Sequence, residues 1–275
     1  MKILIISGSH PRHLYVHKAI LETEHECAAI IMERENLLPV APDGISKEDK
    51  KLFELHFHER HTIESKHFGN ITPKDLFAKT TSYYCYPSGL NSQRSAEFAH
   101  NFGADLAFIF GPDLIKQPLL DSLPSSKINL HLGLSPWYRG SATLFWPFYF
   151  LQPQFTGGTF HQIVPEADAG DILHQFATPL RMGDGIHDAG ARTVLQARND
   201  LRELIAGFGR DEWSYSEQKT TGRLFLTRDF QPAHLRLIYK TYENDIVDQY
   251  LGGCLEQRLP SLKRSQLVKN KLTTY

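Results

Sequence analysis

The sequence has few cysteines, and their arrangement excludes the sites that cysteines usually build. Only Cys27, Cys85 and Cys254 occur among the 275 residues, far apart in the chain. No C-x-x-C pair is present, so we expect neither a cysteine-based zinc site nor a disulfide framework. Three separate thiols are typical of a reducing compartment, and we expect a cytoplasmic location.

Long apolar runs are also missing. No stretch approaches the ~20 apolar residues that a transmembrane helix needs, so we expect no membrane partner. Residues 1–8 open with a short apolar run that ends in turn residues. That run is too short for the apolar region and cleavage site of a signal peptide.

Neither sign of charge is in excess. The chain has 30 Lys and Arg against 31 Asp and Glu, a net charge of -1. A broad nucleic-acid-binding surface would require a basic excess, so we expect no nucleic-acid partner. The chain length and the 41% of hydrophobic residues allow a core of normal size without metal or disulfide support.

Alternating strands and helices predict the fold class. Residues 2–6 and 27–32 are short apolar runs typical of buried parallel strands, and residues 14–24 between them look helical. Strand, helix, strand in this order opens a doubly wound α/β domain with a mostly parallel sheet. Further strands are expected at 105–110, 128–132, 158–164 and 172–176, and helices at 47–66, 93–102, 114–120 and 186–208, with an irregular segment at 68–91.

The character of the chain changes near residue 209. A charged amphipathic stretch at 233–250 and a basic tail with Lys263, Arg264, Lys269 and Lys271 follow. We therefore predict a catalytic domain over residues 1–209 and a small C-terminal subdomain over residues 210–275. Trp213 and Tyr215 in that subdomain would permit a homodimer contact without demanding one.

Polar residues interrupt the expected strand at 128–132. Residues two apart on a strand share a face, so Asn129 and His131 point the same way. Open α/β sheets bind ligands at the carboxyl ends of their strands. Asp168 follows in a turn just before another strand, and we expect the three side chains to converge. Taken singly, they would be read as satisfied polar residues at a sheet edge and an Asx turn.

Three motifs in this order resemble the folate-dependent formyltransferases. They are N-L-H at residues 129–131, L-S-P-W-Y-R-G at 134–140 and D-A-G-D-I-L at 168–173. That family includes enzymes that formylate methionyl-tRNA, glycinamide ribonucleotide and nucleotide-linked amino sugars, and a deformylase that uses water. The resemblance is firmest over residues 105–173 and extends over residues 1–208. Gly133 and Ser135 depart from the pattern, because the family commonly has Ser or Ala at the first position and Leu at the second.

The resemblance implies a co-substrate, a catalytic triad and a Rossmann-like formyltransferase fold. The co-substrate is 10-formyltetrahydrofolate, no metal is involved, and the triad falls on Asn129, His131 and Asp168. The pterin is held largely by the backbone of two loops, which here comprise Phe110, Gly111, Pro112, Asp113, Leu114 and Ile115 in one and Val164, Pro165, Glu166 and Ala167 in the other.

The chemistry of formyl transfer suits these residue types. The reaction passes through a tetrahedral oxyanion, to which Asn129 can donate an N–H, as can a protonated His131; losing such a donor typically costs ~3–4 kcal/mol of barrier. The acceptor amine loses a proton and the leaving folate nitrogen gains one, which imidazole can carry near neutral pH. Asp168 either sets the tautomer and charge of His131 or passes the proton through a water. A metal is not needed, because the N-aryl leaving group already activates the donor.

Two further segments are candidates for contact with the acceptor. Ser9 and Arg12 follow the first strand, where backbone N–H groups often bind phosphate, although an ordinary turn is the simpler interpretation and no G-x-G-x-x-G fingerprint is present. Tyr138 and Arg139 are candidates for the acceptor entrance. His56, His58, His61, Glu64 and His67 crowd the helix expected at 47–66, for which we favour a solvated helix that contacts acceptor over a metal site.

Several acceptors remain open. A tRNA-formylating enzyme would carry a sizeable RNA-binding domain, and only about 66 residues follow residue 209 here. We expect a small-molecule amine, with a nucleotide-linked amino sugar first and hydroxyornithine or glycinamide ribonucleotide as alternatives. A formyltetrahydrofolate hydrolase and a non-enzymatic folate-binding homologue also stay open.

Overall fold

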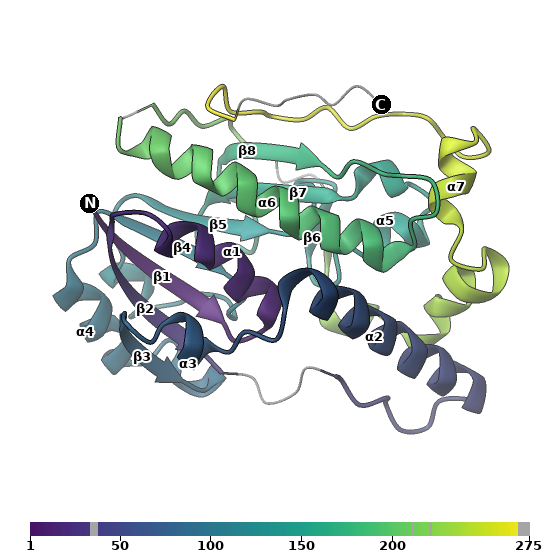
Figure 1. Ribbon diagram of the computed structural model, residues 1–275, viewed down its shortest axis with the longest axis horizontal. Helices are drawn as coiled ribbons and strands as arrows, with labels where there is room; N and C mark the ends of the chain where they lie inside the picture. Colours follow the sequence, from purple (N-terminus) through teal and green to yellow (C-terminus); the bar gives the residue numbers. More distant parts are fainter. Residues whose placement is uncertain (34–37, 211, 220–221, 269–275) are drawn as a thin grey trace.

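A seven-stranded sheet organises the computed structural model, which describes residues 1–33, 38–210, 212–219 and 222–268 (Figure 1). Its order is β3-β2-β1-β4-β5-β7-β8; the first five strands pair in parallel, and β7 runs antiparallel to both β5 and β8. The strands are β1 (Lys2–Gly8), β2 (Glu26–Met32), β3 (Thr81–Cys85), β4 (Leu106–Phe110), β5 (Lys127–His131), β7 (Gly157–Gln162) and β8 (Ile172–Ala177). The predicted α/β class with a mostly parallel sheet is confirmed.

Helices cover both faces of this sheet. The helix α6 packs beside α1 and α2 over one face, and α4 lies on the other (Figure 1). The helices are α1 (Pro11–Leu21), α2 (Lys47–Phe68), α3 (Pro73–Leu76), α4 (Gln93–Phe102), α5 (Trp146–Tyr149), α6 (Ile186–Phe208), α7 (Ile246–Leu251), the short 3-10 helices Pro87–Gly89, Leu120–Ser122, Pro153–Phe155, Thr227–Asp229 and Pro232–His234, and a π-helical turn at Leu237–Thr241. Among these described elements, none is a helix long and apolar enough to cross a membrane.

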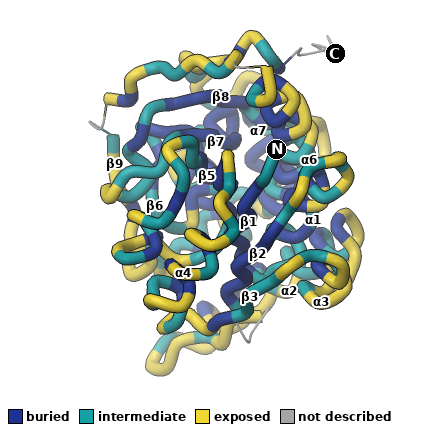
Figure 2. Tube along the Cα trace, turned by 90° about the vertical axis from the view of Figure 1, so that its left-hand side faces the viewer, coloured by how far each residue is buried: buried dark blue, intermediate teal, exposed yellow. Residues whose placement is uncertain are grey.

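The apolar runs of the strands explain the layering. Ile3 and Ile5 of β1 pack beneath α1 and α6, whereas Leu4 and Ile6 face the layer that holds α4. Successive side chains of a strand point to opposite faces, so a strand covered on both sides must be apolar throughout. Figure 2 shows the consequence, a buried central sheet inside a more exposed shell.

A buried histidine lies within the layer between α1 and the sheet. His17 is 0% exposed, and its ring lies 5.3 Å from that of Phe108 and 3.4 Å, measured from Nε2, from the carbonyl oxygen of Phe110. Burial lowers the pKa of His17 to about 3. The folded protein therefore holds this ring in its neutral form.

We expect His17 to make the protein less stable as the pH falls. Between pH ~6.5 and ~3 the unfolded chain binds a proton at this residue and the folded chain does not, so the free energy of unfolding decreases by up to ~1.4 kcal/mol per pH unit. His17→Leu should reduce that slope by a similar amount, measured by urea unfolding between pH 7 and 5. His100→Leu, at an exposed position on α4, is the matched control, and equal slopes in His17→Leu and wild type would contradict the assignment.

Two expected segments differ from the structure. The irregular segment at 68–91 contains the edge strand β3, whose Tyr83 and Tyr84 pair with β2. The helix expected at 114–120 is absent from these described residues, which form turns up to the short helix Leu120–Ser122. Pro118 explains the second error, because proline lacks an N–H and disfavours helical backbone at the residue before it.

The described residues after 209 pack on the rest of the protein. Strand β9 (Arg223–Phe225) pairs with β6 (Tyr138–Gly140) to form a second, two-stranded sheet. Ile238 and Val247 share a buried cluster with Leu134 and Phe145. The stretch expected at 233–250 is divided, since Glu243 and Asn244 have positive φ values of 49° and 63° just before α7. A domain boundary at residue 209 stays a prediction.

The aromatic residues suggested for a homodimer contact pack within the chain. The indole N–H of Trp213 donates to the carbonyl oxygen of Leu204 at 2.6 Å, and its ring lies 4.7 Å from that of Phe208. Tyr215 also packs against the core. Both rings therefore pack within this chain. A homodimer stays a prediction. The basic tail positions Lys269 and Lys271 lie outside the described residues.

Candidate active site

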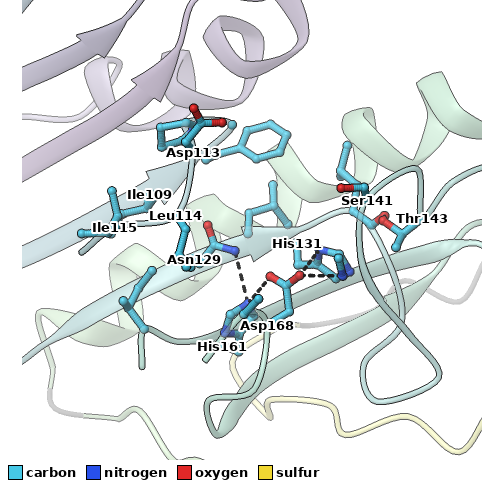
Figure 3. Close-up of a pocket in the computed structure, with 18 of the residues that line it drawn as sticks. Ile109, Asp113, Leu114, Ile115, Asn129, His131, Ser141, Thr143, His161 and Asp168 are labelled. Carbon is cyan, nitrogen blue, oxygen red and sulfur yellow. Dashed lines mark hydrogen bonds and ion pairs between the residues drawn. The ribbon is translucent and has the colours of Figure 1, made fainter. Parts of the chain in front are cut away.

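A cavity of about 520 Å³ opens at the carboxyl ends of β4 and β5, and we call it the sheet-edge cavity (Figure 3). It lies between the loop after β4 and the loop before β8. Its lining comprises Arg12, His13, Ile109, Phe110, Gly111, Pro112, Asp113, Leu114, Ile115, Asn129, Leu130, His131, Leu132, Gly140, Ser141, Thr143, His161, Ile163, Val164, Glu166, Ala167, Asp168 and Thr227.

His131 and Asp168 form an ion pair in this cavity. The Nδ1 atom of His131 lies 3.3 Å from Asp168 Oδ2, and its Nε2 atom lies 2.8 Å from the carbonyl oxygen of Tyr138. Both partners are hydrogen-bond acceptors, and both nitrogens can donate only when the ring is protonated. Nε2 therefore carries the hydrogen that it donates to Tyr138, and Nδ1 faces the carboxylate.

His161 joins the amide to the carboxylate. Its Nδ1 lies 2.7 Å from the carbonyl oxygen of Gln162, so this nitrogen carries a hydrogen. Its Nε2 lies 3.2 Å from Asn129 Nδ2 and 3.4 Å from Asp168 Oδ1. Unprotonated, Nε2 accepts an N–H from Asn129; protonated, it donates to Asp168. The ring lies between these two side chains and bonds to one of them in each state (Figure 3).

Asp168 stays ionised in spite of its burial. Its side chain is 15% exposed, and burial alone would raise the pKa of the carboxyl group. The charge of His131, the ring of His161 and the backbone N–H of Gly140, which donates to Oδ2 at 2.9 Å, outweigh burial and hold the pKa of Asp168 well below its ordinary value. The residue is therefore a carboxylate at neutral pH.

The local turn aims this carboxylate. Asp168 has a φ of 48°, a left-handed conformation that Asp tolerates better than most residues. Gly170 follows because a Cβ there would collide with the carbonyl oxygen of Gln162. The side chain of Gln218 donates to the carbonyl oxygen of Asp168 at 2.6 Å, so a residue beyond α6 supports the turn.

Most of the predicted ligand-contacting positions line the sheet-edge cavity. All six residues predicted in the loop after β4, from Phe110 to Ile115, do so, as do Val164, Glu166 and Ala167 in the other loop. Arg12 is also a lining residue, whereas Pro165 and Ser9 are not. The structure thus brings both loops to the cavity that contains Asn129, His131 and Asp168.

The side chains of Tyr138 and Arg139, predicted as candidates for the acceptor entrance, lie outside the lining of the sheet-edge cavity. Tyr138 is 5% exposed; its ring stacks on Phe225 at 5.9 Å and its hydroxyl donates to Gln152. Arg139 is 9% exposed and does not line the sheet-edge cavity. Pairing of β6 with β9 encloses both side chains, and Tyr138 contributes its backbone carbonyl oxygen instead.

Two histidines of the site were not predicted from the sequence. His161 lies opposite Asn129 in the antiparallel pairing of β5 with β7, a partnership that the one-dimensional pattern does not reveal. A histidine in a strand expected to be buried was the available signal. His13 packs its ring 4.7 Å from that of Phe110. A Cβ on Gly111, whose φ is 89°, would collide with this ring.

A second cavity of about 380 Å³ adjoins the first, and we call it the α2 cavity. Arg12, Leu132, Ser141, Thr143 and Thr227 line both cavities. The remaining lining residues are His56, Phe57, Arg60, Glu64, Ala142, Leu144, Phe145, Ile186, His187, Gly190 and Phe230.

The histidine-rich helix α2 is less solvated than predicted. His56 and Glu64 are only 5% and 7% exposed, because this side of the helix faces the α2 cavity. The phenol of Tyr239 connects His56 Nδ1 at 2.9 Å with His187 Nε2 at 3.3 Å. In the part of the chain that the structure describes, no cluster of three His, Cys, Asp or Glu side chains has the geometry to hold a metal ion.

The fold and the site together define a class of protein. A mostly parallel seven-stranded sheet with an Asn–His–Asp cluster at its carboxyl edge is the arrangement that the motifs of the folate-dependent formyltransferases implied. Comparison with known proteins gives the particular relatives. No protein-family model matches the chain.

Two curated relatives each match about half of this chain. The chain is 29% identical over 143 residues to the methionyl-tRNA formyltransferase of Protochlamydia amoebophila, which covers 51% of this chain and 45% of that protein. It is 28% identical over 130 residues to the bifunctional polymyxin resistance protein ArnA of Wigglesworthia glossinidia brevipalpis, covering 45% of this chain and 19% of that protein. The chain therefore matches less than half of the length of either relative.

Solved structures share the fold over most of the chain. A 4-N formyltransferase from Francisella tularensis superposes with a TM-score of 0.55 at 15% identity, covering 83% of this chain and 77% of that one. An N-formyltransferase from Helicobacter canadensis, solved with folinic acid and dTDP-3-aminofucose, gives 0.54 at 15% identity, covering 88% and 82%. The predicted resemblance to formyltransferases is confirmed, and at these identities the solved structures establish the fold.

Proposed function

We propose that this protein is an N-formyltransferase that moves the formyl group of 10-formyltetrahydrofolate to the amine of a small molecule. The observation that carries the proposal is the convergence of Asn129, His131 and Asp168 on one cavity. These residues come from β5 and from a loop 37 positions further along the chain, so a chance sheet-edge pattern would not bring them together. The names of the relatives support the same reaction.

The sheet-edge cavity suits a folate. Its volume of about 520 Å³ lies within the ~300–1,000 Å³ of typical ligand pockets. Ile109, Ile115 and Val164 offer apolar contact to the pterin ring. Backbone groups of residues 110–115 and 164–167 offer donors and acceptors to the polar edge of the ring.

Asn129, His131 and Asp168 can each take a separate role in formyl transfer. The acceptor nitrogen attacks the formyl carbon, the bond from that carbon to N10 breaks, one proton leaves the acceptor nitrogen and one arrives at N10. We assign stabilisation of the developing oxyanion to an N–H of Asn129, which His161 orients. We assign the proton transfer to the His131–Asp168 pair, in which Nδ1 of the imidazole lies 3.3 Å from the carboxylate.

The adjoining α2 cavity favours transfer to an amine over hydrolysis. A hydrolase needs room for water only, whereas here a second cavity shares five lining residues with the first. We propose a nucleotide-linked amino sugar as the acceptor class, which agrees with the dTDP-3-aminofucose present in the Helicobacter canadensis structure. Hydroxyornithine and glycinamide ribonucleotide are the alternatives to compare.

The test is a transfer assay with 10-formyltetrahydrofolate and a panel of amines. We expect release of tetrahydrofolate to depend on one class of acceptor among dTDP-3-aminofucose, hydroxyornithine and glycinamide ribonucleotide, with the formylated amine identified by mass spectrometry. Equal release of formate with and without amine would instead identify a hydrolase. Binding of 5-formyltetrahydrofolate without any turnover would overturn the proposed activity in favour of a folate-binding protein.

A further inference from the structure

The α2 cavity carries more positive than negative charge. Its charged lining residues are two arginines, Arg12 and Arg60, and one carboxylate, Glu64. Glu64 is already committed to Arg12, since its Oε1 lies 2.7 Å from Arg12 Nη2. Burial lowers the pKa of His56 to about 3 and that of His187 well below its ordinary value, so both imidazoles are neutral near pH 7. One guanidinium is therefore in excess in the cavity lining, although the charge of Glu64 also acts on it and raises its pKa.

Arg60 is that guanidinium. Its central carbon lies 4.5 Å from the centroid of the Phe57 ring, and its Nε is buried without a hydrogen-bond partner among the residues that the structure describes. Burial and the neighbouring Arg12 lower the pKa of Arg60 to about 10 against the opposing effect of Glu64, so the group is still charged at neutral pH. A desolvated charge is costly unless it is paired, and a guanidinium fork matches a carboxylate or phosphate.

An aromatic wall lies beside this charge. Phe57, Phe145 and Phe230 all line the α2 cavity, and the last two rings meet edge to face at 4.9 Å. Leu132, which directly follows His131 in the chain, lines the junction with the sheet-edge cavity. A ligand with an apolar or planar part and an anionic part would satisfy both kinds of lining.

We propose that the α2 cavity binds the acceptor amine through an anionic group, a carboxylate or a phosphate, that pairs with Arg60. The apolar part of the acceptor packs against Phe57, Phe145 and Phe230, and its amine extends past Leu132 toward Asn129 and His131. The identity of this ligand as the formyl acceptor rests on the proposed function. The anion preference of the cavity rests on Arg60 and its surroundings alone.

Three small probes test the anion preference without any knowledge of the true acceptor. Phenylacetate and 2-phenylacetamide have nearly the same shape and differ in charge, and benzylphosphonate stands for a phosphate. In calorimetric titrations of the full chain, we expect the better anion to bind at least about tenfold more tightly than the amide. The stronger of the two anions identifies a carboxylate or a phosphate as the recognised group.

Variants of Arg60 assign the preference to this residue. Arg60→Gln should abolish the advantage of the anions, and Arg60→Lys, which keeps the charge but loses the planar fork, should retain part of it. Arg94→Gln, at an exposed position on α4, is the matched control and should behave like wild type. Urea unfolding, with midpoints compared with wild type, verifies that each variant is folded.

The outcomes separate this inference from the proposed reaction. Equal binding of anions and amide by wild type, or an anion preference that survives in Arg60→Gln, overturns the assignment of Arg60. An anion preference that depends on Arg60, in a protein that transfers no formyl group, supports the site and removes the formyltransferase proposal. Formyl transfer to anionic acceptors, with a raised KM for the acceptor in Arg60→Gln, supports both the anion site and the formyltransferase proposal.

Discussion

Asp168→Asn lowers kcat for formyl transfer by about 10³-fold or more, while the variant still folds and still binds 5-formyltetrahydrofolate. The carboxylate has three partners at once: Oδ2 accepts from the N–H of Gly140 and faces His131, and Oδ1 faces His161. An Asn side chain has one acceptor oxygen, so it cannot satisfy all three. The substitution also removes the negative charge that faces Nδ1 of His131.

Single-turnover and steady-state kinetics, compared with wild type, measure this loss. Asp171→Asn is the matched control, because Asp171 lies three residues further along the same turn and does not line the sheet-edge cavity. We expect its kcat to stay within about twofold of wild type, as for most substitutions away from the chemistry. A kcat close to wild type in Asp168→Asn would remove Asp168 from the reaction.

Gly133→Ala lowers kcat by about 10²-fold through displacement of His131, with little change in folate affinity. A Cβ on Gly133 would collide with Nε2 of His131 and would lie 2.6 Å from the carbonyl oxygen of Tyr138 and 2.8 Å from Cβ of Thr143. The last two atoms are held by the backbone, and Thr143 is further fixed by its hydrogen bond to Leu132 at 2.5 Å. The imidazole must therefore move, and the overlap with the carbonyl oxygen of Tyr138 forces a shift of the loop backbone as well. His131 then loses its hydrogen bond to Tyr138 and its position beside Asp168.

Gly133 is a position where the chain departs from the formyltransferase pattern, which commonly has Ser or Ala. The absence of a side chain at Gly133 leaves room for the ring of His131 against Tyr138, so we interpret Gly133 as a positioning residue. Gly209→Ala is the control, because the nearest atom to a Cβ there is 3.9 Å away.

The readouts for Gly133→Ala are kcat, the dependence of kcat on pH and the affinity for 5-formyltetrahydrofolate. Displacement of the ring should lower kcat and change its pH profile without weakening folate binding, whereas general unfolding would reduce both. An unchanged kcat and pH profile would show that contact with Gly133 does not place His131.

Much of the fold could be predicted from local sequence, because burial on both faces leaves a clear apolar run. The strands at residues 27–32 and 105–110 and the helices 93–102 and 186–208 were expected within a residue or two of their observed bounds. The edge strand β3 could not be recognised in the same way, because its Thr81 and Ser82 are not apolar and an edge strand is covered less completely. The alternation of Asn129 and His131 on β5 likewise needed only the two-residue period of a strand.

The contacts within the candidate site could not be predicted from local sequence. Nothing near Asn129 in the sequence indicates His161 as its neighbour, because that contact depends on the antiparallel register of β5 with β7. The burial of Tyr138 depends on β9, whose residues lie more than 80 positions further along the chain. The charge of the α2 cavity depends on how far Glu64 is committed to Arg12, a pairing between two helices.

The sequence by itself determined the fold class, the strand that carries Asn129 and His131, and the acidic turn at Asp168. It also determined the resemblance of these motifs to the formyltransferases. Each of these depends on side chains within a few residues of one another. The tertiary structure alone decided that His161 lies between the amide and the carboxylate, that Gly133 makes room for His131, and that Arg60 on α2 lines a second cavity in which two arginines share one carboxylate. These contacts join segments far apart in the chain, and only the packing of the folded protein sets the distances on which hydrogen bonds and ion pairs depend.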